Sequence, residues 1–124
     1  MILNQDDMKP IYIQIAEWLE TEIISENINA DEKMYSQYQL ADMFTINPAT
    51  AAKGLNILAE QNILYKKRGL GMFVSVDARE RILLTRKEQI LKKMVSELVE
   101  EAKRLSVTED ELVNMIKEMN KEES

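Results

Sequence analysis

The side chains of this sequence that are best suited to binding chemistry lie between residues 49 and 68. Ala49, Thr50 and Lys53 share one side of an expected helix, and the basic run Lys66-Lys67-Arg68 follows them. Threonine bonds groups on base edges, alanine contacts a thymine methyl, and lysine and arginine pair with phosphates. The pattern therefore favours double-stranded DNA as a ligand, although alanine and threonine are common on any exposed helix face.

The composition gives little support to catalytic or metal-binding chemistry. The chain has no Cys and no His, which excludes zinc sites of the usual Cys/His type and catalytic triads built on either residue. Its 22 acidic residues show no pairing that stands out from solvated helix faces. We therefore expect no enzymatic activity, no metal site and no cofactor.

Charge is unevenly distributed along the chain. The formal net charge is -6, which by itself argues against a nucleic-acid partner. Between Met43 and Val76, however, Glu60 is the only acid against four basic residues, so this segment carries a net charge of +3. Affinity for phosphate depends on the field at the contact surface, so a locally positive face is compatible with DNA binding that is strongly salt-sensitive.

Two short helices are expected to position these side chains. Ser36 and Gln39 form a capping box that opens the first helix. Thr45-Ile46-Asn47 turns the chain, and Asn47-Pro48 starts the second helix with a good N-cap and a residue whose φ is already set. The apolar residues expected to face inward from the two helices are Leu40, Ala41, Phe44, Ala51, Leu55, Ile57 and Leu58.

A hairpin is expected after the second helix. Its strands are predicted at Ile63-Leu64-Tyr65 and Met72-Phe73-Val74, and Gly69 and Gly71 allow a tight bend between them. Two helices joined by a short turn and followed by a basic hairpin describe a winged helix-turn-helix. The fold class predicted is mostly α with a small β-hairpin, with residues 1–76 as the DNA-binding domain.

A helix is also expected before this unit, beginning near Pro10. Ile11, Ile15, Leu19 and Ile23 recur every four residues and form a stripe that we expect to pack on the helix-turn-helix. Gly54, inside the second helix, costs up to about 1 kcal/mol relative to alanine. We therefore expect it to permit close approach of another element.

The C-terminal part of the chain, residues 77–124, changes character. Leu84, Leu91, Leu98 and Leu105 are spaced by seven on a helix predicted from about Ala78 to Leu105, and Thr108 starts a last helix. Two amphipathic helices of this length would leave an apolar face exposed, so we predict a two-helix dimerisation tail rather than packing onto the chain's own core. The residues assigned to the dimer contact are Leu84, Leu91, Val95, Leu98, Ala102, Leu112 and Ile116.

Several of these segments resemble the GntR family of bacterial repressors. The matching stretches, which together cover Pro10 to Ser75, are PIYIQIAEWLETEII, Ser36 with Leu40-Ala41, NPATAAKGL from Asn47, and GLGMFV from Gly69. The Asn-Pro start of the second helix and the short tail resemble the YtrA-like subfamily in particular. The resemblance implies a winged helix-turn-helix, a homodimer and control of transporter operons.

The resemblance also implies which residues contact DNA. The family's contact positions fall on Ser36, Asn47, Ala49, Thr50, Lys53, Arg68 and Gly69. Tyr38 stands where the family usually has arginine, Leu70 where a basic wing residue is common, and Ala30-Asp31 where Pro-Gly is usual. We also expect Tyr38 to contact a phosphate through its hydroxyl and Lys67 to contact one through its charge.

The sequence thus predicts a cytoplasmic, homodimeric DNA-binding repressor that recognises an inverted-repeat operator. The cytoplasmic location is expected because residues 1–7 do not resemble a signal peptide, Cys is absent and no apolar run approaches the length of a membrane span. The alternative is a winged-helix module that binds another protein through its apolar helices and does not bind DNA. No small-molecule effector is identified by these residues.

Overall fold

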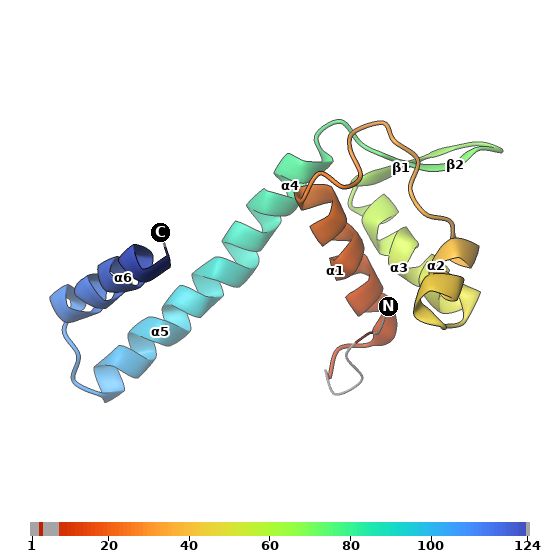
Figure 1. Ribbon diagram of the computed structural model, residues 1–124. Coiled ribbons are helices and arrows are strands. Elements are labelled where there is room, and N and C mark those ends of the chain that lie inside the picture. Colours follow the sequence, from red (N-terminus) through yellow and green to blue (C-terminus); the bar gives the residue numbers. More distant parts are fainter. Residues whose placement is uncertain (1–2, 4–7, 124) are drawn as a thin grey trace. The chain divides into compact units, whose positions relative to one another are not determined.

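The structure, a computed structural model, describes residue 3 and residues 8–123, so the prediction about a signal peptide lies almost wholly outside the described residues. The chain divides into two compact units, Met1–Leu84 and Thr85–Ser124 (Figure 1). The elements in chain order are α1 (Ile11–Ile24), α2 (Gln37–Phe44), α3 (Pro48–Glu60), β1 (Leu64–Lys67), β2 (Gly71–Val74), α4 (Ala78–Thr85), the π-helix η1 (Arg86–Leu91), α5 (Lys92–Arg104) and α6 (Glu109–Glu123). A mostly helical fold with one two-stranded antiparallel hairpin confirms the predicted class.

Local sequence signals determine where α2 and α3 begin. The Ser36 hydroxyl accepts a hydrogen bond from the Gln39 backbone N–H at 3.1 Å, and the Gln39 side chain accepts one from the Ser36 N–H at 2.8 Å. Asn47 caps α3 by accepting from the Ala49 N–H at 2.8 Å, and Pro48 occupies the first turn. Thr45, with φ at +54°, ends α2 in the left-handed region. The capping box and the Asn-Pro start are both confirmed.

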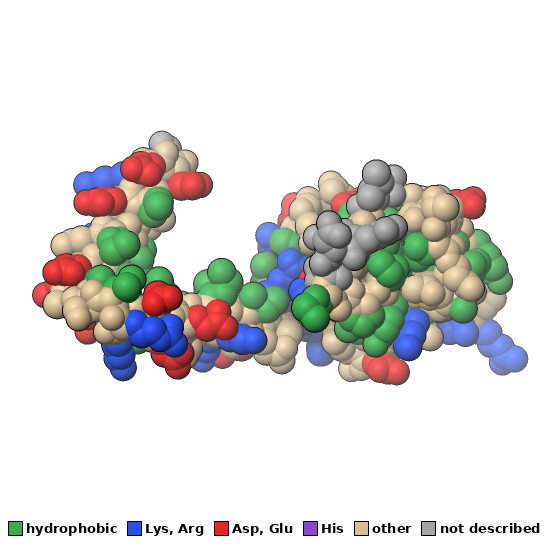
Figure 2. All heavy atoms as spheres, turned by 90° about the horizontal axis from the view of Figure 1, so that it is seen from below, with side chains coloured by type: hydrophobic (Ala, Val, Ile, Leu, Met, Phe, Trp, Pro, Cys, Tyr) green, Lys and Arg blue, Asp and Glu red, His purple; other side chains and the backbone are tan. Residues whose placement is uncertain are grey.

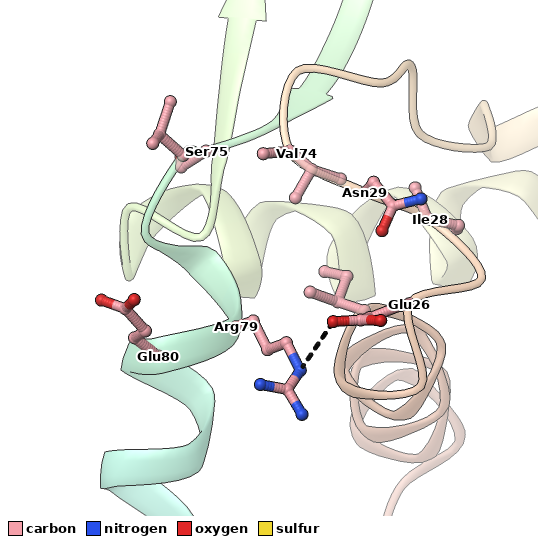
Figure 3. A pocket seen from close by; sticks show the side chains of 10 residues that line it. Glu26, Ile28, Asn29, Val74, Ser75, Arg79 and Glu80 are labelled. Carbon is pink, nitrogen blue, oxygen red and sulfur yellow. Dashed lines mark ion pairs between the residues drawn. The ribbon is translucent and has the colours of Figure 1, made fainter.

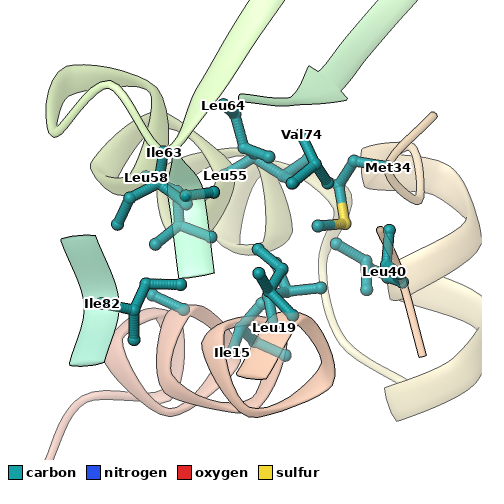
Figure 4. Packing of buried hydrophobic residues seen from close by; sticks show 14 of the residues in the cluster. Ile15, Leu19, Met34, Leu40, Leu55, Leu58, Ile63, Leu64, Val74 and Ile82 are labelled. Carbon is teal, nitrogen blue, oxygen red and sulfur yellow. The ribbon is translucent and has the colours of Figure 1, made fainter. Parts of the chain in front are cut away.

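The core of the first unit draws one or more residues from each of its elements (Figure 4). The α1 stripe is buried as predicted at Ile15, Leu19 and Ile23. Trp18 meets the Phe44 ring edge-on at 5.1 Å, joining α1 to α2. The fully buried large side chains of this core are Ile15, Leu19, Met34, Leu40, Leu58, Val74 and Ile82.

Gly54 lies where α3 crosses α1. A Cβ added to it would stand 2.9 Å from the Tyr12 carbonyl oxygen and 3.0 Å from Ile15 Cγ2. These distances are shorter than normal van der Waals contacts, so only glycine lets the two helices come this close. The close approach expected from the sequence is confirmed, and its partner is α1.

The hairpin, called the wing below, ends at Val74 as predicted, but its strands have other bounds at their remaining ends. Lys66 and Lys67 were placed in the loop, but both belong to β1, where Lys67 pairs with Gly71. The connection shrinks to Arg68-Gly69-Leu70, closed by a hydrogen bond from the Leu70 N–H to the Lys67 carbonyl at 2.9 Å. Gly69 has φ of +78° and Gly71 φ of +114°. Glycine adopts such positive φ values at little cost, which explains why it occurs at both positions.

The segment before α2, which is polar in sequence, pairs with the free edge of β2 through an isolated β-bridge. Lys33 forms an isolated antiparallel bridge with Phe73. The Asp31 N–H donates to the Val74 carbonyl at 2.7 Å, and the Met34 N–H donates to the Met72 carbonyl at 2.8 Å. The hydrogen-bond partners are backbone groups on the free edge of β2. The side-chain pattern of the polar segment therefore does not indicate this pairing.

The first unit also extends past the predicted boundary at residue 76. Ala78 and Ile82 of α4 are fully buried in the same core as α1 and α3. The helix predicted from about Ala78 to Leu105 is confirmed as three contiguous helical segments, α4, η1 and α5, of which η1 is π-helical. The assignment of separate functions to residues 1–76 and 77–124 stays a prediction.

In the second unit, α5 and α6 are amphipathic as predicted. The Thr108 hydroxyl accepts from the Glu111 N–H at 3.2 Å and caps the start of α6. Hydrophobic side chains gather along one side of this unit, with acidic and basic side chains elsewhere (Figure 2). Ala102 is its one buried residue among those described, so most of the apolar face of the tail is uncovered within a single chain.

Candidate nucleic-acid interface

The start of α3 presents the side chains predicted to read base edges. Asn47 and Ala49 are exposed and Thr50 is half-buried, whereas Ala51 on the opposite side is fully buried. Asn47 uses its side-chain oxygen for the cap, so its amide N–H groups remain available to donate outward. The first backbone N–H groups of the helix add a partial positive charge at the same end, which favours phosphate.

Lys53 lies on α3 and is exposed. Its ammonium lies 4.3 Å from the centre of the Tyr12 ring, so α1 supplies an aromatic support for it. Cation–π contacts of this kind orient an ammonium group without neutralising it. Lys53 therefore presents its ammonium group at an exposed position of α3.

Ser36 and Tyr38 lie at the start of α2. The Ser36 oxygen is occupied by the capping box, which leaves its hydroxyl hydrogen as the group free to donate. Tyr38 is 69% exposed, so its hydroxyl can reach a phosphate as predicted.

The wing carries Lys67, Arg68 and Gly69 at its tip, all of them exposed. The Lys67 ammonium lies 4.5 Å from the Phe73 ring centre, and the Phe73 ring stacks on Tyr65 at 5.9 Å. Arg68 and Leu70 flank Gly69 in the connecting loop, and Leu70 is 60% exposed. An arginine beside a narrow glycine turn is suited to entering a minor groove or contacting a phosphate.

The Tyr65 hydroxyl anchors the wing to the segment before α2. It donates to Asp31 Oδ1 at 2.8 Å. This hydrogen bond, together with partial desolvation and the charge of the carboxylate, raises the pKa of Tyr65 above its ordinary value of 10.0. The wing is therefore tied both by backbone bonds and by this side-chain bond.

Basic side chains gather at the wing end of the first unit in the space-filling view (Figure 2). No acid forms an ion pair with Lys53, Lys67 or Arg68 in the part of the chain that the structure describes. Exposed cations that form no ion pair are well suited to binding a polyanion. The sequence-predicted residues thus fall on three neighbouring elements, the starts of α2 and α3 and the wing tip.

One cation that the sequence reasoning did not select also belongs to this region. Lys33, in the segment before α2, runs across Gly71, and its Cε lies 3.1 Å from where a Gly71 Cβ would be. Its place in a polar stretch gave no signal, because only the pairing with Phe73 brings it to the wing.

The predicted dimer residues lie mainly on exposed positions of the tail. Leu84, Leu91, Val95, Leu98 and Ile116 are between 43% and 60% exposed, and Leu112 is half-buried. Ala102 differs, because it is 8% exposed within the single chain. A groove of about 290 Å³ in the second unit is lined by Leu98, Leu112, Met115, Ile116, Met119 and Asn120.

A second groove, of about 410 Å³, lies within the first unit beside the end of β2 (Figure 3). Arg79 Nε donates to the Ile24 carbonyl at 2.9 Å and lies 3.8 Å from Glu26 Oε1. The guanidinium thereby ties the start of α4 to the C-terminal end of α1. Glu80 adds a second acid to the groove, so its rim carries charges of both signs.

Two other features, a metal site and a membrane-spanning helix, are absent from the described residues. No group of three or more acidic side chains is arranged to hold a metal ion among residues 3 and 8–123. Within the same residues, none of the helices combines the length and apolar character needed to cross a membrane.

Comparison with known proteins gives consistent results, although no protein-family model matches the chain. The transcriptional repressor NagR of Bacillus subtilis is 34% identical over 83 residues, which are 67% of this chain and 34% of NagR. The repressor YtrA of the same organism is 27% identical over 111 residues, which are 90% of this chain and 85% of YtrA. The chain therefore spans about a third of NagR but most of YtrA.

Solved structures extend the similarity to the whole fold. A GntR family transcriptional regulator from Listeria monocytogenes is 30% identical with a TM-score of 0.73, covering 91% of this chain and 97% of that one. The DNA-binding domain of AraR, in complex with operator ORX1, is 29% identical with a TM-score of 0.57, covering 60% of this chain and 95% of that one. Because its relatives and structural neighbours are DNA-binding regulators, this chain belongs to the GntR family of transcriptional regulators and is of the YtrA-like kind.

Proposed function

We propose that this chain is a cytoplasmic, homodimeric repressor that binds an inverted-repeat operator, with one winged unit on each half-site. The observation that carries the proposal is the arrangement within the first unit. The exposed start of α3, the start of α2 and the wing tip present hydroxyl and amide groups together with basic groups that form no ion pair among the described residues.

Each predicted contact residue has a distinct role in this proposal. Asn47, Ala49 and Thr50 read base edges in the major groove. Lys53 and Lys67 bind phosphates, helped by the hydroxyls of Ser36 and Tyr38. Arg68 and Gly69 place the wing tip in or beside the adjacent minor groove.

The tail supports the proposed dimer. Its exposed apolar side chains form a contiguous face on α5 and α6, and soluble monomers rarely leave such faces uncovered. A second copy of the chain is the proposed occupant, because a symmetric dimer matches the two-fold symmetry of an inverted repeat. Half-sites would then lie about one helical turn apart or at the spacing that the dimer dictates.

A transporter operon, including this protein's own gene, is the proposed target. The support for this choice is the YtrA-like resemblance, since the contact residues themselves do not specify an operator sequence. No effector forms part of the proposal.

The decisive experiment is a fluorescence-anisotropy titration of the protein against the DNA upstream of its own gene, at low and moderate salt. We expect tight, sequence-selective binding that weakens steeply as salt increases. Arg68→Ala should lower the salt slope by about one unit, because one phosphate contact is lost. Lys93→Ala, at an exposed position of α5, is the matched control and should leave the slope unchanged.

The rival function is a winged-helix module that binds a protein partner. The net charge of -6 and the tyrosine at position 38 favour it. It predicts that folded, dimeric protein binds no duplex at either salt concentration. Salt-sensitive binding without preference over random DNA would keep the DNA-binding role and reject the assigned operator.

A further inference from the structure

We infer that Lys33 and Lys67 together form a phosphate-binding site on the outer face of the wing, which extends the DNA contact from the wing tip back to the segment before α2. The inference rests on the proposed DNA-binding function. Its ligand is the phosphodiester backbone of duplex DNA.

The register of the sheet places both lysines on one face. Residues that are directly opposite in antiparallel strands share a face, as do residues two apart on one strand. Lys33 is opposite Phe73, Phe73 is opposite Tyr65, and Lys67 is opposite Gly71. Lys33, Tyr65, Lys67, Gly71 and Phe73 therefore share a face, whereas Leu64 and Val74 of the other face are buried in the core.

The positions of the two side chains agree with this register. The Lys67 ammonium lies 4.5 Å from the Phe73 ring centre. The Lys33 stem crosses Gly71, with Nζ at 3.9 Å from the position of a Gly71 Cβ. A Cβ at residue 71 would lie 3.1 Å from Lys33 Cε, so a larger residue there would require the flexible Lys33 stem to shift.

Neither lysine forms an ion pair within the described chain. The acids nearest to Lys33 in sequence make hydrogen bonds elsewhere, since Asp31 accepts from the Tyr65 hydroxyl at 2.8 Å and Glu32 accepts from the Asn29 N–H at 3.1 Å. No ion pair to Lys33 or Lys67 occurs among residues 3 and 8–123. Two cations on one face of the sheet repel each other. An anion bound between them is attracted by both and offsets this repulsion.

DNA phosphate is the anion that fits this position. Lys67 pairs with Gly71 directly before the wing loop, which already contains Arg68 and Gly69. A duplex that receives the wing tip would continue past this face. The contact involves no base edge, so it should add affinity for every sequence equally.

The test compares Lys33→Gln with the wild-type protein in anisotropy titrations against the upstream DNA and a random duplex. Glutamine keeps a long stem across Gly71 but removes the charge. We expect the salt slope to fall by about 0.9, so that the loss of affinity is about 3-fold larger at about 50 mM than at about 200 mM salt. The preference for the upstream DNA should not change, and Lys33→Arg should restore the slope.

The controls separate this inference from the proposed function. Lys93→Ala should leave the slope unchanged, and thermal unfolding should show that each variant is folded. If Arg68→Ala lowers the slope while Lys33→Gln does not, the Lys33 site is wrong and the DNA-binding function stands. If the folded wild-type protein binds no duplex, both are overturned.

Discussion

The Lys53 ammonium lies 4.3 Å from the centre of the Tyr12 ring, a contact that joins α3 to α1 beside the proposed DNA surface. An exposed cation–π contact contributes about 0.5–1 kcal/mol. A double-mutant cycle with Tyr12→Leu and Lys53→Met should therefore give a coupling free energy of about that size in urea unfolding. A cycle pairing Tyr12→Leu with Lys66→Met is the control, and equal coupling in both cycles would contradict the contact.

Gly54→Ala should destabilise the protein although alanine favours helix formation. The new Cβ would stand 2.9 Å from the Tyr12 carbonyl oxygen, which is backbone and moves only if α1 moves. Overpacking of this kind costs about 1–3 kcal/mol, which outweighs the gain of up to about 1 kcal/mol in helix propensity. Chemical denaturation provides the measurement, and Asn56→Ala, at an exposed position of the same helix, should change stability by less than about 0.5 kcal/mol. A stabilised Gly54→Ala protein would show that the helices do not approach this closely.

Substitutions of Ser36 should separate its capping role from its proposed contact with DNA. Ser36→Ala removes the acceptor for the Gln39 N–H and should cost about 0.5–2 kcal/mol in unfolding free energy. Ser36→Asp retains a good cap and should keep most of that stability, but its negative charge would face phosphate and should weaken operator binding. If Ser36→Asp binds DNA as tightly as the wild-type protein, Ser36 does not lie at the interface.

Leu98→Asp should convert the proposed dimer into monomers. Leu98 is 43% exposed and lines the apolar groove of the second unit, so a charge there would have to be buried in the dimer contact. Loss of the second half-site should weaken operator binding by about 100-fold or more. Sedimentation measures the first effect and an anisotropy titration the second.

Ser96→Asp is the matched control for Leu98→Asp, because it adds the same charge on the opposite side of α5 and should remain dimeric. A Leu98→Asp protein that sediments as a dimer would reject the assignment of this face.

Tyr65 should titrate above the ordinary tyrosine pKa of 10.0, because its hydroxyl donates to Asp31 and the carboxylate opposes loss of the proton. A pKa raised in the folded state means that the stabilisation is fully present below about pH 10 and is lost as the pH rises through the folded-state pKa. Ultraviolet difference titration of the wild-type and Tyr65→Phe proteins isolates this group. Asp31→Asn should bring the pKa back toward 10.0, and an unchanged value would exclude the carboxylate as its cause.

Sequence-local signals predicted much of the fold and of the proposed interface. The capping partners Ser36 and Gln39 are three residues apart, and Asn47 caps a backbone N–H two residues away, so both follow from the chain alone. The four-residue recurrence in α1 likewise specified which side is buried. Such interactions depend on neighbours in sequence, and they place Ala49 and Arg68 on exposed positions and Thr50 on a half-buried position of the expected elements.

Only the tertiary structure decided the contacts between distant segments. Lys33 reaches the wing because the free edge of β2 pairs with a polar stretch that shows no strand pattern. Lys53 meets the ring of Tyr12 because Gly54 allows α3 to approach α1. Packing also extended the core to Ile82, beyond the predicted boundary. Local sequence determined where helices begin and which sides are apolar, whereas the position of each cation depended on backbone pairing and close packing between residues far apart in the chain.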